Sequence, residues 1–425
     1  SYREERMAAQ EARQPDRAVR REPAVPCQPV VDPAGWRAED LRASGAHLFH
    51  LTAEDRREID AAIRGVERCG VPIMRIAAKD FGLPALGGKL AGIRRDILDG
   101  RGFVQIRGFQ PERYTPLQRA IAFWGVSMHL GERVASQNAK GHVLGHITDI
   151  GESVRNPNQR GPYSNDRIPY HSDCCDIVGL MCIHPAQSGG ESGIASSVTI
   201  HNELLRRRPD LLPVLTEPYY RDRRGEVPAG MEPWYKIPIF NYNEGYLTTT
   251  IEPTYIGSAH RHPGVPEMTP RQREALDYVQ ALAMELRLDI DFHRGDMQFL
   301  NNHVIMHTRQ AYVDYPEPER RRHLLRIWII AKGCRPLPRA CFARHGDPAR
   351  ERARFAVPHD GARSRAESDE PALALERDDD VAVRRRGDGL REPARAEHRV
   401  GRDLDAVTVQ PEDVFLGRPP RGHVE

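Results

Sequence analysis

Two stretches decide what this sequence predicts: Tyr170-His171-Ser172-Asp173, and Asn301-Asn302-His303-Val304-Ile305-Met306-His307. Residues i and i+2 of a β-strand project from the same face, so His171 and Asp173 can present a nitrogen and an oxygen to one metal. A distant strand can add His307 as a third ligand. Two histidines and one carboxylate leave adjacent coordination positions open, which is typical of non-haem Fe(II) oxygenases.

The His-x-Asp pair is a weak signal by itself, because it occurs often by chance in surface and core positions. The choice of the second histidine is also open at this point. His303 and His307 are four residues apart and would share one face of a strand.

A basic cluster follows His307 and turns into an alternating, strand-like stretch, Arg320-Arg321-Arg322-His323-Leu324-Leu325-Arg326-Ile327-Trp328. Arg322 and Arg326 would share a face of this strand. An arginine on the inner face of a β-barrel needs an anionic partner, because an unpaired buried charge is costly. A guanidinium beside a hydroxyl is well suited to the distal carboxylate of 2-oxoglutarate.

The composition excludes several classes of protein. Of the 425 residues, 39% are hydrophobic and 29% are charged, and the net charge of +2 favours neither nucleic-acid nor membrane-surface binding. No apolar run approaches the roughly 20 residues of a membrane helix, and the N-terminal stretch lacks the apolar core of a secretory signal. The seven irregularly spaced cysteines indicate reduced thiols. We therefore expect a cytoplasmic protein with a small-molecule substrate, as a monomer or a homo-oligomer.

Composition also predicts the domain organisation. Residues 1–34 mix charge with several prolines and are expected to be disordered. Residues 35–343 should form a single domain, with a helical N-terminal part (35–100) and a β core (about 100–335). Residues 344–425 combine dense charge with scattered apolar residues, so we expect a largely disordered charged tail.

The hydrophobic periodicity predicts several short strands with a few flanking helices. Helices are expected at 52–66, 85–98, 115–128, 199–215 with an interruption at Pro209, and 269–286. Strands are expected at 102–106, 177–183, 194–198, 235–240, 245–251, 297–300 and 324–330. Residues 135–170 show little periodicity and predict a long functional loop that could act as a lid. The pattern favours a mainly β, α+β fold with an antiparallel jelly-roll core.

Taken in order, these pieces resemble the taurine dioxygenase (TauD/TfdA) family of Fe(II)/2-oxoglutarate oxygenases over roughly residues 100–335. The matching pieces are His171-Ser172-Asp173, Ser188-Gly189-Gly190-Glu191-Ser192, Gly295-Asp296, Asn302 with His307, and Arg322 to Trp328. The resemblance implies a double-stranded β-helix, with His171, Asp173 and His307 as iron ligands. The family places an asparagine five residues before its ligand, which favours His307 over His303.

The same resemblance implies how the co-substrate is bound. Arg322 would bind the distal carboxylate of 2-oxoglutarate, and Ser192 stands where family members often have a threonine hydroxyl beside it. We group Arg326 with these expected cofactor-binding residues. It matches an arginine that contacts an anionic substrate in some members of the family. The presence of Asp173 disfavours halogenation. Residues such as Asn165, Arg167 and Tyr170 do not match the taurine enzyme's pattern, so taurine is not implied as substrate.

The resulting prediction is a dioxygenase that uses Fe(II), 2-oxoglutarate and O2 to hydroxylate an unactivated C–H bond of a small anionic molecule, releasing succinate and CO2. The first alternative is desaturation or cyclisation by the same cofactor chemistry. The second is a non-catalytic metal-binding jelly-roll sensor, which would have no need of Arg322 and Ser192.

Overall fold

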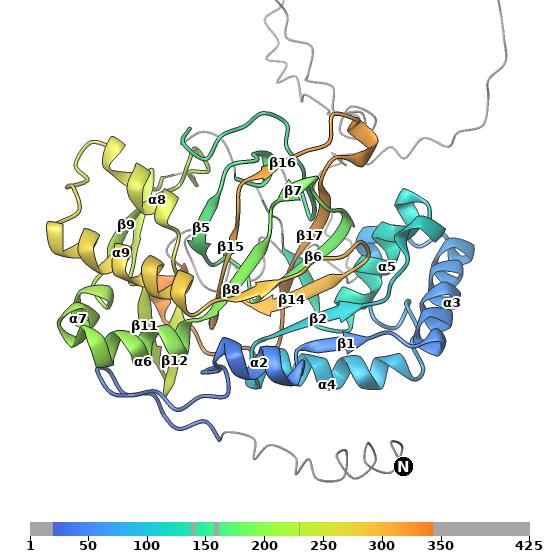
Figure 1. Cartoon of the computed structure of the whole chain (residues 1–425), viewed down its shortest axis with the longest axis horizontal. Coiled ribbons are helices and arrows are strands. Elements are labelled where there is room, and N and C mark those ends of the chain that lie inside the picture. Colours follow the sequence, from blue (N-terminus) through green and yellow to red (C-terminus); the bar gives the residue numbers. More distant parts are fainter. Residues whose placement is uncertain (1–19, 136, 138–141, 157–160, 229, 343–425) are drawn as a thin grey trace, which may run out of the picture. The chain divides into compact units, whose positions relative to one another are not determined.

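The structure, a computed structural model, describes residues 20–135, 137, 142–156, 161–228 and 230–342 (Figure 1). The chain divides into two units, residues 1–359 and 360–425. Everything below concerns the described part of the first unit. The predicted charged tail (344–425) and the first part of the predicted N-terminal segment (1–19) lie outside the described residues, and their disorder stays a prediction.

Two antiparallel sheets form the core of the domain. The larger sheet has the strand order β1-β2-β14-β6-β17-β3, with β4 also paired to β17 and with β1 parallel to β2. Its strands are β1 (Leu48–His50), β2 (Phe103–Arg107), β3 (Arg133–Ala135), β4 (Leu144–Ile147), β6 (Ile177–His184), β14 (Met297–Asn301) and β17 (His323–Ile330).

The smaller sheet has the order β13-β8-β15-β5. Its strands are β5 (Ile168–His171), β8 (Ser192–Ser196), β13 (Leu288–Ile290) and β15 (Ile305–Arg309). Three two-stranded pairs complete the β structure, made by β7 (Ser188–Gly189) with β16 (Tyr312–Val313), β9 (Tyr219–Asp222) with β10 (Trp234–Ile237), and β11 (Phe240–Asn243) with β12 (Tyr246–Thr249). Residues of both main sheets line one cavity. The predicted mainly β fold with a jelly-roll core and flanking helices is confirmed.

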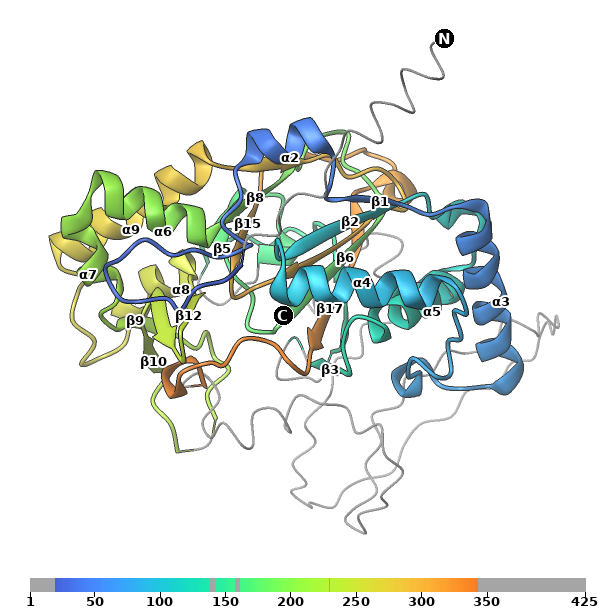
Figure 2. The ribbon, with the colours of Figure 1, turned by 90° about the horizontal axis from the view of Figure 1, so that it is seen from below.

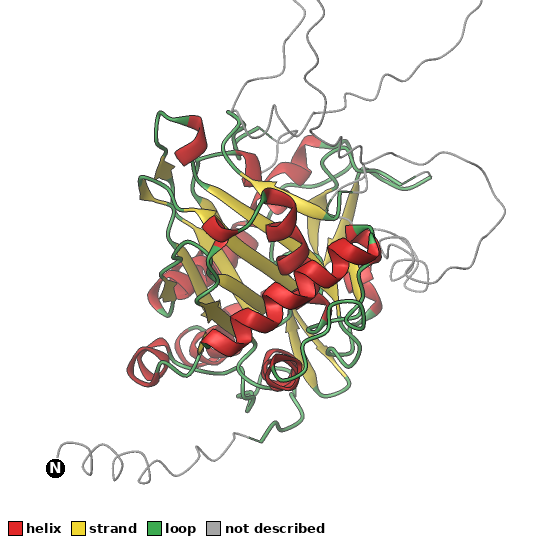
Figure 3. Cartoon of the chain, turned by 90° about the vertical axis from the view of Figure 1, so that its right-hand side faces the viewer, coloured by secondary structure: helices red, strands yellow, loops and turns green. Residues whose placement is uncertain are grey.

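The helices form two groups on different sides of the strands (Figures 1 and 2). The first group packs on the larger sheet and shares an apolar core with β2, β6, β14 and β17, and helices cross in front of these strands in Figure 3. It consists of α3 (Ala53–Cys69), α4 (Leu86–Asp99) and α5 (Pro116–Met128). The second group shares a core with β8 and β15, and consists of α2 (Ala38–Ser44), α6 (Ser197–Arg207), α7 (Leu212–Leu215), α8 (Pro253–Ser258) and α9 (Pro270–Glu285).

Local sequence explains where these helices begin. Thr52, Thr115 and Thr269 each accept a hydrogen bond from the backbone N–H three residues later, and the side chain at that later position bonds back. Such capping boxes satisfy backbone donors that have no partner inside the helix. Ser196 caps α6 in a similar way, so the strand expected at 194–198 ends two residues earlier and the chain turns into a helix.

Two sequence-based expectations need correction. Residues 135–170 are not a structureless loop, because they include β4, which pairs with β17, and β5, which carries His171. These strands were missed because they are short and flanked by polar residues. The disordered segment also cannot extend to residue 34, because Val30 and Ala34 are buried and Asp32 lies 2.8 Å from the guanidinium of Arg335. That partner lies 303 residues away, so the local composition gave no sign of it.

Candidate active site

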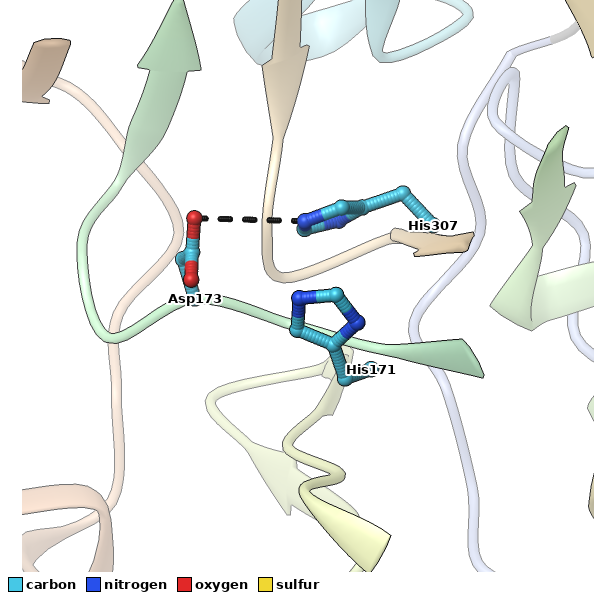
Figure 4. Close-up of side chains that lie close together, drawn as sticks. All are labelled: His171, Asp173 and His307. Atoms are coloured by element: carbon cyan, nitrogen blue, oxygen red, sulfur yellow. Dashed lines mark ion pairs between the residues drawn. The ribbon is translucent and has the colours of Figure 1, made fainter. Parts of the chain in front are cut away.

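Strand pairing brings the two predicted histidine ligands together. β15 runs antiparallel to β5, with His307 directly opposite His171. Side chains of such a pair project from the same face of the sheet and are close neighbours. The two imidazole rings have centroids 4.2 Å apart (Figure 4).

Asp173 reaches the same place from a turn rather than from a strand. β5 ends at His171, whereas the sequence placed Asp173 on the same strand. The backbone N–H of Asp173 donates to Oδ1 of Asn302 at 3.0 Å, and the Asn302 amide in turn donates to Sγ of Cys175 at 3.1 Å. Asn302 therefore fixes the turn that carries Asp173, which gives the asparagine before His307 a structural role.

The ligand atoms of His171, Asp173 and His307 lie within 4.8 Å of one another, so they could hold one metal ion. Oδ2 of Asp173 is 3.9 Å from Nε2 of His307 (Figure 4). His171 Nδ1 donates to the carbonyl of Pro169 at 2.9 Å, which leaves the lone pair of Nε2 available. His307 Nδ1 is buried without a hydrogen-bond partner among the described residues. The nitrogen that faces Asp173 is Nε2, so Nε2 is the atom of His307 placed to bind a metal together with that carboxylate.

The charges of the three groups also suit a metal. Burial and the adjacent His171 lower the pKa of His307 to about 3, so its imidazole is neutral at physiological pH. Burial alone would raise the pKa of Asp173, but Arg326 and the two histidines outweigh it and lower that pKa to about 2. A neutral imidazole and an ionised carboxylate are the forms that bind a metal.

Two residues of β17 hold the carboxylate of Asp173. Trp328 Nε1 donates to Oδ2 of Asp173 at 3.0 Å. Arg326 Nη1 lies 3.7 Å from the same oxygen, and its Nε donates to Gln137 Oε1 at 2.8 Å. Arg326 is therefore placed beside the metal site. The sequence did not reveal that Trp328 contacts Asp173, although its position two residues after Arg326 put both on one strand face.

His303 points into a different cluster. Its Nε2 lies 3.0 Å from Oδ1 of Asp176, and Cys334 completes a second group of potential ligand atoms within 4.8 Å. Both Asp176 and His303 are buried. The structure thus separates the two candidate histidines, with only His307 beside His171 and Asp173.

The cavity above the three groups carries the predicted co-substrate residues. Ser192, Arg322 and Arg326 all line it, together with apolar side chains of the larger sheet such as Leu180 and Leu324. Arg322 is only 5% exposed, and its Nη1 has no hydrogen-bond partner among the described residues. Residues of the 147–169 stretch, including Ile147, Val154 and Ile168, form part of the wall.

The Ser188–Ser192 motif explains how Arg322 is accommodated. Gly190 has φ +73°, and a Cβ there would lie 3.2 Å from Nε of Arg322 and 3.2 Å from Cβ of Tyr312. A side chain would therefore meet the arginine in a backbone conformation that glycine adopts most readily. The Gly-Gly pair lets the chain pass directly over Arg322.

Sequence reasoning missed Arg309, which is also 5% exposed and also lines the cavity. It follows His307 by two residues on β15, so the alternation of a strand could have placed it on the same face. Burial and the neighbouring charge of Arg322 lower the pKa of Arg309 to about 10, which leaves it charged at neutral pH.

Comparison with known proteins identifies the family. Residues 68–328 match the model of the taurine catabolism dioxygenase TauD, TfdA family. The chain belongs to this family. The chain is thus an Fe(II)/2-oxoglutarate-dependent oxygenase, and the predicted requirement for Fe(II), 2-oxoglutarate and O2 is confirmed. The three-ligand group described above fits the iron of such enzymes.

Two curated relatives cover most of the described domain. A taurine hydroxylase-like protein, SAT17, from Stachybotrys chartarum is 31% identical over 310 residues, which is 70% of this chain and 78% of the relative. FR-33289 synthase from Streptomyces rubellomurinus is 30% identical over 320 residues, covering 73% of this chain and 93% of the relative.

Solved structures share the fold at lower sequence identity. An asparagine oxygenase in complex with Fe(II), 2S,3S-3-hydroxyasparagine and succinate matches with a TM-score of 0.53 at 15% identity, covering 67% of this chain and 93% of that one. The non-heme iron oxygenase OrfP, in complex with Fe, succinate and (3R,4R)-dihydroxy-L-Arg, matches with a TM-score of 0.51 at 16% identity, covering 67% and 94%.

Among the described residues, no helix has the length and apolar character needed to span a membrane. No disulfide joins any of the cysteines in the part of the chain that the structure describes. The predicted cytoplasmic location and the possible homo-oligomer are not tested by these observations and stay predictions.

Proposed function

We propose that this TauD/TfdA-family oxygenase hydroxylates an unactivated C–H bond of a small anionic molecule. The observation that carries the proposal is the meeting of His171, Asp173 and His307 at the floor of a cavity that also contains buried arginines. The name of the taurine hydroxylase-like relative, and the hydroxylated amino acids bound in the solved structures, support hydroxylation over desaturation or cyclisation. Membership of an oxygenase family, together with Arg322 and Ser192 in the cavity, argues against a non-catalytic sensor.

In this proposal each residue has a distinct role. His171, Asp173 and His307 hold Fe(II), while Arg322 and Ser192 hold the distal carboxylate of 2-oxoglutarate. When bound, the iron and 2-oxoglutarate supply the O2-dependent oxidation that yields succinate and CO2. The chain's own contribution is to fix the ligands, orient the substrate and exclude water, for which the apolar wall formed by residues such as Leu180, Leu324 and Trp328 is suited.

Arg326 is the proposed partner of the anionic group of the substrate. It lies at the metal site and lines the cavity. The same cavity is also lined by Arg224, Glu252 and Tyr255. A wall with charges of both signs suits an amino-acid-like molecule with an acidic group, and hydroxylated amino acids are bound in the asparagine oxygenase and OrfP structures.

The test is a substrate panel of amino acids, sulfonates, phosphonates and simple carboxylates with the iron-loaded enzyme. We expect one class to yield succinate and a product heavier by one oxygen atom in equal amounts. The Asp173→Ala variant should produce neither. Unchanged turnover in that variant would overturn the assignment of Asp173, and a product lighter by two hydrogen atoms would overturn hydroxylation.

A further inference from the structure

The cavity is lined by two buried arginines that both lie close to one aromatic ring. The guanidinium carbon of Arg309 lies 4.9 Å from the ring centroid of Tyr312, and that of Arg322 lies 5.0 Å from it. Both arginines are 5% exposed, and both line the cavity. Two cations held this close, away from water, repel each other unless an anion lies between or beside them.

Among the described residues, no carboxylate forms a hydrogen bond with the unpaired nitrogens of these two guanidinium groups. Nε and Nη1 of Arg309 and Nη1 of Arg322 are buried without hydrogen-bond partners in the part of the chain that the structure describes. The nearby Asp314 accepts the backbone N–H of Arg322 at 2.6 Å rather than its side chain. The short internal stretches outside the described residues (136, 138–141, 157–160 and 229) contain no Asp or Glu.

The contacts of Arg309 leave two of its nitrogens for a ligand. Its Nη2 donates to the backbone carbonyl of Asp166, which orients the guanidinium plane. On the neighbouring strand, Ser192 is the direct cross-strand partner of Arg309. Arg309 is therefore adjacent to the serine proposed to contact 2-oxoglutarate. It also shares the ring of Tyr312 with Arg322, the arginine proposed to bind the distal carboxylate.

We propose that Arg309 is a second cationic anchor for the distal carboxylate of 2-oxoglutarate, acting together with Arg322. This inference rests on the proposed roles of Arg322 and Ser192. A carboxylate bound by the two guanidinium groups would accept hydrogen bonds from donors that are otherwise unpaired. Binding would then depend on the presence of that carboxylate. The arrangement selects for 2-oxo dicarboxylic acids over 2-oxo acids that lack the second acid group.

The test compares two keto acids that differ in the distal carboxylate. Anaerobic titration of the Fe(II)-loaded protein with 2-oxoglutarate or 2-oxopentanoate, followed by the visible charge-transfer band, gives a dissociation constant for each. For Arg309→Leu we expect the constant for 2-oxoglutarate to rise at least about tenfold, the effect of losing a charge-assisted hydrogen bond. The constant for 2-oxopentanoate should change by less than about twofold, because it has no group to meet Arg309.

Two further variants complete the experiment. Arg322→Leu supplies the reference loss for 2-oxoglutarate, and Arg309→Lys should show a partial loss because it keeps the charge without the planar pair of donors. Equal weakening of both keto acids by Arg309→Leu would overturn the inference in favour of a structural role, as would no weakening of either. If wild-type protein gives no band with 2-oxoglutarate, the proposed co-substrate site itself fails, which is a separate result.

Discussion

At the scale of single residues, the hydrogen bond from Trp328 to Asp173 is the contact most specific to the metal site. It donates to the carboxylate oxygen that also faces Arg326 and His307. Partners of this kind orient a metal ligand and tune its affinity, and their loss commonly weakens metal binding about 10- to 100-fold. Trp328 is thus a positioning residue, since it acts through Asp173.

We predict that Trp328→Phe weakens Fe(II) binding by about tenfold or more, because it removes the donor and keeps most of the apolar volume. Anaerobic Fe(II) titration measures the effect. Trp124→Phe is a matched control, since Trp124 is likewise a buried tryptophan with a hydrogen-bonded indole, but it donates to the carbonyl of Ile76, away from the metal site. Its iron affinity should equal that of wild type. Equal affinity in the Trp328 variant would show that the bond has no role in metal binding.

The two histidines of the metal site could be predicted from the sequence, whereas one arginine of the cavity could not. His171 and His307 could be selected because the order of motifs is specific and because Asn302 precedes His307 by five residues. Arg309 was overlooked because one arginine close to a histidine is unremarkable in a sequence with 62 lysines and arginines. Its significance comes from burial and from unpaired nitrogens, which only the three-dimensional structure reveals.

At the scale of elements, the Ser188–Ser192 stretch shapes the co-substrate end of the cavity. Gly190 and Gly264 both have positive φ, at +73° and +81°. A Cβ at Gly190 would crowd Arg322 and Tyr312, whereas a Cβ at Gly264 meets nothing within 4 Å. A comparison of alanine substitutions at the two positions therefore distinguishes the effect of backbone strain from the effect of crowding the cavity residues.

We predict that Gly190→Ala and Gly264→Ala each lower the free energy of unfolding by about 1–2 kcal/mol, the cost of a side chain in the left-handed region. Only Gly190→Ala should also weaken 2-oxoglutarate binding, because it displaces Arg322. Denaturant unfolding and anaerobic titration of the two variants measure these effects. An equal loss of 2-oxoglutarate affinity in both variants would contradict the role given to this stretch.

The elements themselves were predictable to different degrees. Long periodic segments such as α9 and strongly apolar strands such as β6 and β17 follow directly from local sequence. β4 and β5 do not, because their stability comes from pairing with β17 and β15. Pairing between distant strands is not encoded in the composition of a four-residue segment.

At the scale of the whole domain, the buried carboxylate of Asp32 anchors residues 20–34 to Arg335, which follows the last strand of the β core. Asp32 contacts Arg335 at 2.8 Å and Arg21 at 2.9 Å, and the side chains of Asp32 and Arg335 are 2% and 1% exposed. Burial alone would raise the pKa of Asp32, but Arg335 and its hydrogen bonds outweigh burial and lower it.

We predict that Asp32→Asn lowers the free energy of unfolding at pH 7 by about 3–5 kcal/mol, because it leaves Arg335 buried without its counter-ion. The folded-state pKa of Asp32 lies below its unfolded value, so this stabilisation is present above about pH 4 and is lost as the pH falls through the folded-state pKa. The difference in free energy of unfolding between wild type and Asp32→Asn, measured by denaturant unfolding, should therefore be smaller at low pH than at pH 7.

A surface ion pair provides the control for this prediction. Arg320 and Glu317 are 3.5 Å apart, with side chains 54% and 46% exposed. Glu317→Gln should cost under about 1 kcal/mol at any pH. A comparably small effect of Asp32→Asn at pH 7 would mean that residues 20–34 contribute little to the stability of the domain.

The central claim is that His171, Asp173 and His307 bind the iron to which 2-oxoglutarate attaches. Its most direct test is the visible charge-transfer band formed when Fe(II) and 2-oxoglutarate are added without O2 to three proteins: wild type, His307→Ala and His303→Ala. We predict the band in wild type and in His303→Ala, and its loss in His307→Ala. A band that survives in His307→Ala and disappears in His303→Ala would contradict the account.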